Sequence, residues 1–105
     1  MIFKRKNRYI LVESSSPVDV STARNNAFLM SKLKEYLGEH SFTEANPKII
    51  SILDQNNFIL RVSRGTERST LLAFAFIRSM EGKEIGFYTI RTSGTVRSLK
   101  ERWKE

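Results

Sequence analysis

The sequence predicts an α+β fold of the ferredoxin-like kind, a βαββαβ sandwich with a four-stranded antiparallel sheet and an added C-terminal helix. Strand-like and helix-like segments follow one another in that order, with apolar residues at the matching periods. A length of 105 residues without a linker suits one domain. We therefore expect a single domain over 1–105, with a basic N-terminal arm at 1–7 and a C-terminal helix at about 95–103.

The first strand and first helix are expected before residue 38. Residues 8–13 are rich in β-branched and aromatic side chains, which is typical of a strand. A helix is expected to run to about Leu37, with Asp19 or Ser21 as its N-cap and Gly38 as its stop. The apolar stripe expected for this helix is Ala23, Ala27, Met30, Leu33 and Leu37.

The remaining elements follow a break at Ala45-Asn46-Pro47, where proline interrupts the chain. The expected elements are a strand at 48–54, a turn at Asn56-Asn57, a strand at 58–64, a helix at 67–80, a strand at 84–92 and a helix at 95–103.

The expected strands are apolar on both faces, which is typical of a sheet that is covered on both sides. The opposed sets are Tyr9 and Leu11 against Ile10 and Val12, Ile50 and Ile52 against Ile49 and Leu53, and Ile85 and Phe87 against Tyr88 and Ile90. The C-terminal helix is the natural cover for the second face, because Val96, Leu99 and Trp103 form one stripe.

The charge balance favours a polyanionic partner. The chain has 18 Lys and Arg against 11 Asp and Glu, a net charge of +7, which points to nucleic acid first and an anionic membrane second. The lack of cysteine excludes thiolate zinc sites and disulfides and suits an intracellular protein. No apolar run reaches the roughly 18 residues of a membrane span, and the run after the basic N-terminus is too short for a signal peptide.

Catalysis by this chain is not expected. The single histidine, His40, follows Gly38 and is predicted to be a solvated loop residue. The carboxylates are scattered without metal-ligand spacing, and phosphate-loop, dinucleotide and nucleophile-elbow motifs are missing. An acylphosphatase-like enzyme is disfavoured because the loop after the first strand has no glycine.

The segment Arg91–Arg97 links the last expected strand to the last helix and has two interpretations. Backbone N–H groups at a helix start, together with two arginines, can bind a phosphate. Alternatively, Ser93 or Thr95 only caps the helix and the arginines are solvated.

Basic residues gather in the N-terminal arm, on the third strand and around that turn, and Arg8 and Arg61 are expected to share the middle of the sheet. The third strand lacks the stacking aromatics of an RRM, so contacts to the backbone of a structured RNA are favoured over base stacking. For the arm, simple solubilisation is an equal alternative. The candidate RNA-binding residues are Lys4, Arg5, Lys6, Arg8, Arg61, Arg64, Arg91, Ser93, Gly94, Thr95 and Arg97.

The second expected helix has no polar residue over 71–77, so part of it would face water in a monomer. Extra burial under the loop near Phe42 is one explanation, and a protein interface is the favoured one. The candidate interface residues are Leu71, Phe74, Phe76 and Ile77.

Four segments together resemble a known family. They are Arg8-Tyr9-Ile10-Leu11-Val12-Glu13, Glu44-Ala45-Asn46-Pro47-Lys48, Ile59-Leu60-Arg61-Val62 followed by Arg64, and Thr92-Ser93-Gly94-Thr95-Val96-Arg97. In this order they span nearly the whole chain, which resembles the eukaryotic and archaeal ribonuclease P protein component 2 family, its archaeal members in particular. Ser14-Ser15-Ser16 and Ser63 depart from the family pattern.

The resemblance implies a ferredoxin-like or RRM-like subunit of ribonuclease P, the cytoplasmic ribonucleoprotein that removes 5′ leaders from precursor tRNA. In that family the RNA holds the catalytic site and its magnesium, so this chain is expected to be non-catalytic and to bind no cofactor or membrane. The implied partners are ribonuclease P RNA, precursor tRNA indirectly, protein component 3 and other subunits, with self-association through a heterotetramer. Another structured-RNA-binding or ribosome-associated adaptor is the alternative.

Overall fold

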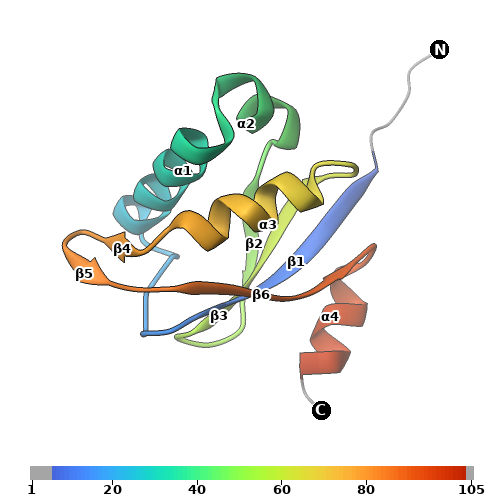
Figure 1. Cartoon of the computed structure of the whole chain (residues 1–105). Coiled ribbons are helices and arrows are strands. Elements are labelled where there is room, and N and C mark those ends of the chain that lie inside the picture. Colours follow the sequence, from blue (N-terminus) through green and yellow to red (C-terminus); the bar gives the residue numbers. More distant parts are fainter. Residues whose placement is uncertain (1–5, 104–105) are drawn as a thin grey trace.

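A computed structural model describes residues 6–103 as a four-stranded antiparallel sheet with helices on both faces (Figure 1). The strand order is β2-β3-β1-β6, so β1 and β3 are central, and the predicted ferredoxin-like fold is confirmed. The elements are β1 (Asn7–Ser14), α1 (Ala23–Leu37), α2 (Glu39–Ala45), β2 (Lys48–Ile52), β3 (Asn57–Ser63), α3 (Glu67–Phe76), β4 (Ser79–Met80), β5 (Lys83–Glu84), β6 (Phe87–Ser93) and α4 (Val96–Trp103).

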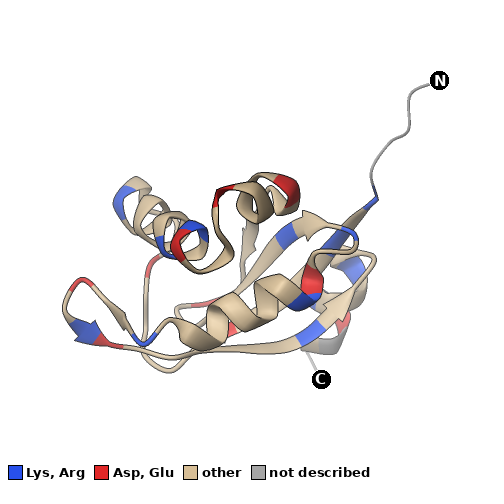
Figure 2. Cartoon of the chain, turned by 45° about the horizontal axis from the view of Figure 1, so that its top comes forward, with Lys and Arg blue, Asp and Glu red and all other residues tan. Residues whose placement is uncertain are grey.

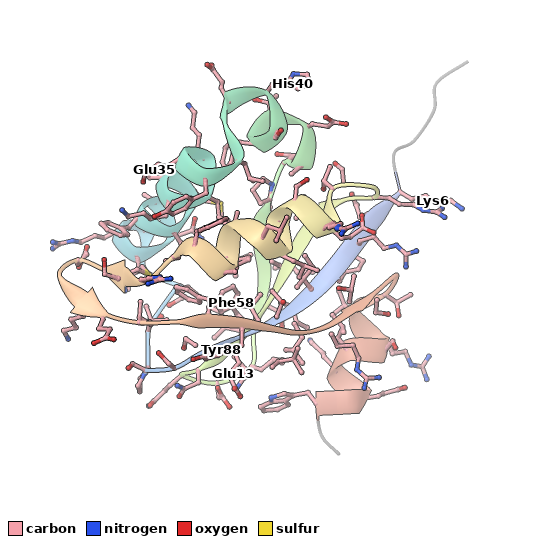
Figure 3. The ribbon with its side chains drawn as sticks, in the orientation of Figure 1. Lys6, Glu13, Glu35, His40, Phe58 and Tyr88 are labelled. Atoms are coloured by element: carbon pink, nitrogen blue, oxygen red, sulfur yellow. The ribbon has the colours of Figure 1, made fainter. Side chains whose placement is uncertain are left out.

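The main core lies between the sheet and the layer formed by α1 and α3. Its centre is three aromatic rings: Phe74 of α3 lies 6.4 Å from Phe58 of β3 and 5.7 Å from Phe87 of β6, centroid to centroid. Figure 3 shows Phe58 on the α3 side of the sheet, whereas Glu13 and Tyr88 project from the other face. The alternation predicted for β1 is confirmed, because Ile10 and Val12 join this core and Leu11 does not.

The second face is covered in part by α4, as its apolar stripe predicts. Leu99 is fully buried against Leu11 and Ile59, and Val96 packs beside them. The expectation that Trp103 and Tyr88 are covered as well is wrong, since their exposed fractions are 37% and 54%. An eight-residue helix packed on β1 and β6 is too short to cover the whole face.

Two irregularities in the ladder explain the other errors in the predicted faces. The register of β2 against β3 shifts between Ile49 and Ser51. Ile50 therefore packs with Leu53 on the α4 side of the sheet, whereas Ile52, which was expected on the same face as Ile50, is exposed. In β6 the register against β1 shifts so that Ile90 has no direct partner and is exposed. Each extra residue reverses the alternation of faces along its strand.

Helix α1 begins later and is rotated relative to the prediction. Its N-cap is Thr22, whose hydroxyl accepts a hydrogen bond from the Asn25 N–H at 3.2 Å, and Gly38 ends the helix with a φ of 84°. Leu29 and Leu33 face the core, whereas Ala23 and Ala27 are exposed. The large leucines define the buried face because they remove more apolar surface from water than alanines do.

Two elements have no counterpart in the prediction. Residues 39–45 form helix α2, so His40 lies on a helix and not in a loop, with its Nε2 3.7 Å from Glu44 Oε2. Helix α3 ends at Phe76, not at 80, and a β4–β5 ribbon follows. Its loop, Glu81-Gly82, has positive φ at both residues, as a tight two-residue hairpin requires.

Prediction for the α4 contact: Leu99→Ala lowers the free energy of unfolding by about 2–5 kcal/mol, because the change leaves a cavity between α4 and the sheet. The matched control is Leu72→Ala on α3, since Leu72 is 56% exposed and Leu99 is 0% exposed. Urea unfolding followed by circular dichroism measures both. Equal stability of the two variants would contradict the packing of α4.

Candidate nucleic-acid interface

A basic pocket lies at one end of the sheet. Antiparallel pairing brings the start of β1, the end of β3 and the end of β6 together there, with Asn7 opposite Ser63 and Tyr9 opposite Ser93. The pocket has a volume of about 350 Å³. It is lined by Lys6, Asn7, Arg8, Tyr9, Arg64 and Gly94. Figure 2 shows Lys and Arg on neighbouring strands at this end, and Figure 3 shows Lys6 at the start of β1.

Local backbone structure holds the cations of the pocket together. The Arg64 N–H donates to the Lys6 carbonyl at 2.8 Å, which extends the β1–β3 ladder by one hydrogen bond and places the two side chains at neighbouring positions. Arg64 and Lys6 are exposed, and neither forms an ion pair with another described residue. Two exposed cations are thus available to an anion in the pocket.

Arg8 lies between the two turns that border the pocket. Its Nε is 3.9 Å from Glu67 Oε2 at the start of α3, and that carboxylate also accepts from the Gly65 N–H. On the other side, Arg8 Nη1 lies 3.5 Å from where a Cβ on Gly94 would be. The Arg8 guanidinium therefore lies close to the turn before α4.

The turn before α4 is a capped helix start. The Thr95 hydroxyl accepts from the Ser98 N–H at 3.2 Å, and the Ser93 hydroxyl accepts from the Thr95 N–H at the same distance. The capping interpretation is confirmed, and phosphate contact at this turn stays a prediction. Arg97 points away from the pocket toward Glu101, with Nε 3.1 Å from Oε1 one helical turn later.

The remaining basic candidates do not all lie in the pocket. Arg8 and Arg61 lie on the two central strands, as expected, but on opposite faces of the sheet. Arg8 pairs with Val62 on the helix side, whereas Arg61 pairs with Tyr9 on the α4 side. Exposed Arg91 lies opposite Leu11 on β6. Two further candidates, Lys4 and Arg5, lie outside the described residues.

The candidate protein interface on α3 needs correction. Phe74 and Ile77 are buried in the main core and Leu71 is half-buried, because the helical period turns these residues toward the sheet. The large apolar side chains of this run that are exposed are Leu72 and Phe76, and the Phe76 ring stacks on Tyr36 of α1 at 5.7 Å. The outer face of the helical layer thus carries an apolar patch, Tyr36–Leu72–Phe76. Of these three, the prediction included only Phe76.

The described residues, 6–103, contain neither a metal-binding cluster nor a membrane-spanning helix. Within that part of the chain, no group of three or more His, Asp or Glu side chains could hold a metal ion. No helix in the same range is both long and apolar enough to span a bilayer.

A model of the Rpp14/Pop5 family matches residues 8–104, which include every described element from the pocket to α4. The chain belongs to the Rpp14/Pop5 family. The resemblance found in the four sequence segments is thereby confirmed. The matched range includes Arg8, Arg64 and Gly94, so most of the pocket lies within the family domain.

Two relatives and one solved structure are similar to this family member. Ribonuclease P protein component 2 of Methanosphaerula palustris is 36% identical over 47 residues, covering 45% of this chain and 29% of the relative. Probable ribonuclease P/MRP protein subunit POP5 of Dictyostelium discoideum is 32% identical over 101 residues, covering 88% and 58%. The matches thus span less than two thirds of either relative.

A chain in a cryo-EM structure of yeast ribonuclease MRP has the same fold. Its TM-score is 0.61 at 11% identity, over 99% of this chain and 95% of that one. At that identity, the likeness concerns the fold alone.

Prediction for the helical layer: Phe74→Glu unfolds the Rpp14/Pop5 domain, because it places an unpaired carboxylate in the aromatic core. Phe76→Glu keeps the fold, since that side chain is 60% exposed against 0% for Phe74. Far-ultraviolet circular dichroism and thermal unfolding compare the two variants. A folded Phe74→Glu protein would contradict the assigned core.

Proposed function

We propose that this chain is a protein subunit of a ribonucleoprotein of the ribonuclease P or ribonuclease MRP kind and binds the backbone of the RNA with its basic pocket. One observation carries the proposal: in a chain of the Rpp14/Pop5 family, Lys6, Arg8 and Arg64 converge on one hollow at the end of the sheet. The named relatives support the assignment to this class of complex.

The chemistry of the pocket suits phosphate. Arginine presents a planar fork of N–H donors that matches two phosphate oxygens, and lysine adds a compact charge. Each neutralised phosphate releases counterions, which favours binding and makes it salt-dependent. Arg8 is held between the turns at Gly65 and Gly94, so its guanidinium is partly ordered before RNA arrives. Less side-chain entropy is then lost on binding.

The chain acts on catalysis indirectly in this proposal. The RNA holds the reacting groups and their magnesium, and this subunit binds no cofactor of its own. Cations placed between crowded phosphates lower their mutual repulsion, so the RNA folds at a lower magnesium concentration. The substrate, precursor tRNA, is then reached through the RNA and not through a cleft of this domain.

A second surface of the subunit serves protein assembly. The Tyr36–Leu72–Phe76 patch lies on the outer side of α1 and α3, away from the α4 face of the sheet. Exposed apolar patches of this kind mark protein contacts. We assign it to another protein subunit of the complex, with component 3 as the leading candidate.

Prediction for the pocket: the double variant Lys6→Ala/Arg64→Ala weakens binding to ribonuclease P RNA. The slope of log K against log salt concentration becomes shallower by about 0.7–0.9 per lost phosphate contact. Filter binding at several potassium chloride concentrations measures the slope. Both residues are exposed and carry no ion pair among the described residues, so the fold is expected to survive.

The matched control is Arg78→Ala/Lys83→Ala, which removes the same two charges from exposed positions at the β4–β5 end. If only the net charge of the protein mattered, the salt slope would become shallower by the same amount in both double variants. An equal loss would therefore contradict a specific pocket.

Prediction for activity: added to ribonuclease P RNA with its partner subunits, the wild-type chain stimulates cleavage of precursor tRNA at limiting magnesium. The Lys6→Ala/Arg64→Ala variant requires more magnesium to reach the same rate, because fewer phosphates are neutralised. Gel analysis of 5′-leader release over a magnesium series gives the magnesium concentration at which cleavage is half-maximal with each protein. No stimulation by the wild-type chain would refute the assigned function.

A further inference from the structure

One row of side chains crosses all four strands on the α4 face of the sheet. Lys48 of β2 lies directly opposite Arg61 of β3, Arg61 lies opposite Tyr9 of β1, and Tyr9 lies opposite Ser93 of β6. Directly paired residues of antiparallel strands point to the same face. This row, Lys48–Arg61–Tyr9–Ser93, therefore forms a continuous line across the sheet.

The row meets the basic pocket at the end of the sheet, where Tyr9 lies on the α4 side and its neighbour Arg8 lies on the helix side. Tyr9 lines the pocket and also packs against the cluster under α4, so it belongs to both. Ser93 stands at the other end of the row and supplies the hydroxyl that accepts from the Thr95 N–H. The row thus borders the pocket at Tyr9 and reaches the turn before α4 at Ser93.

The two cations of the row are free to meet a ligand. Helix α4 packs on β6 and β1, so the β2–β3 part of the row lies beside this helix. Lys48 is exposed and Arg61 is half-exposed. Neither forms an ion pair with another residue in the described range 6–103. No protein carboxylate therefore competes for them there.

We propose that the RNA backbone runs from the pocket across the strands along this row, so that Lys48 and Arg61 contact further phosphates. Adjacent strands lie about 4.8 Å apart, which puts Lys48 about 10 Å from Tyr9. One phosphate in the pocket cannot reach Lys48 over that distance, and a polyanion can. The inference rests on the proposed function and gives the RNA a direction, perpendicular to β1 and β3.

The test is the double variant Lys48→Ala/Arg61→Ala, measured with ribonuclease P RNA over a salt series. The salt slope is expected to become shallower by about 0.7–0.9 for each of the two cations. Lys48→Ala alone is expected to give about half of that change. Because Lys48 is exposed, this single variant tests the row even if the Arg61 substitution disturbs folding. Arg78→Ala/Lys83→Ala is again the charge-matched control.

Inorganic phosphate serves as the single-anion probe. In an NMR titration at constant ionic strength, it is expected to shift the amides of Gly94 and Arg64 equally in the wild-type chain and in Lys48→Ala. A smaller shift in the variant would overturn the proposal, because Lys48 would then act within the pocket.

The outcomes separate this inference from the proposed function. An unchanged slope for Lys48→Ala/Arg61→Ala, beside a reduced slope for Lys6→Ala/Arg64→Ala, overturns the row and leaves the pocket in place. Unchanged slopes for both double variants overturn both. Reduced slopes for both, with an unchanged control, support a path that includes pocket and row.

Discussion

The antiparallel pairing of β1 with β3 on one side and β6 on the other is the constraint on which the rest of this structure depends. It sends Ile10 and Val12 into the main core and Leu11 toward α4. The same pairing brings the start of β1, the end of β3 and the end of β6 to one end of the sheet. The pocket is basic because Lys6 and Arg8 lie at the start of β1 and Arg64 directly follows β3, while the turn after β6 contributes Gly94.

This arrangement separates the surfaces of the domain by function. The pocket lies at one end of the sheet, the Lys48–Arg61–Tyr9–Ser93 row lies on the α4 face, and the apolar Tyr36–Leu72–Phe76 patch lies on the outer side of the helices. In the proposed complex, RNA and a protein partner would therefore bind to separate surfaces of the domain. Helix α4 packs on β1 and β6 and covers Ile59 of β3, whereas Lys48 stays exposed and Arg61 half-exposed on the same face.

Sequence patterns were sufficient for the order of the four long strands and of helices α1, α3 and α4, and for the docking of Leu99, because long periodic segments define their buried face. They failed where a pattern is short or uniform. The β4–β5 ribbon has two residues per strand, and an all-apolar run does not show that Phe74 is buried while Phe76 is exposed. The pocket was predictable only as separate residues, since strand register decides that Arg8 and Arg61 lie on opposite faces.

Lysine footprinting tests the central claim, RNA binding at the pocket, most directly. The protein is acetylated with and without ribonuclease P RNA, and mass spectrometry compares Lys6, Lys48 and Lys83. All three are exposed in the structure, so each reacts in the free protein. The account predicts that RNA protects Lys6 and Lys48 and leaves Lys83 reactive. A Lys6 that reacts equally with and without bound RNA would contradict it.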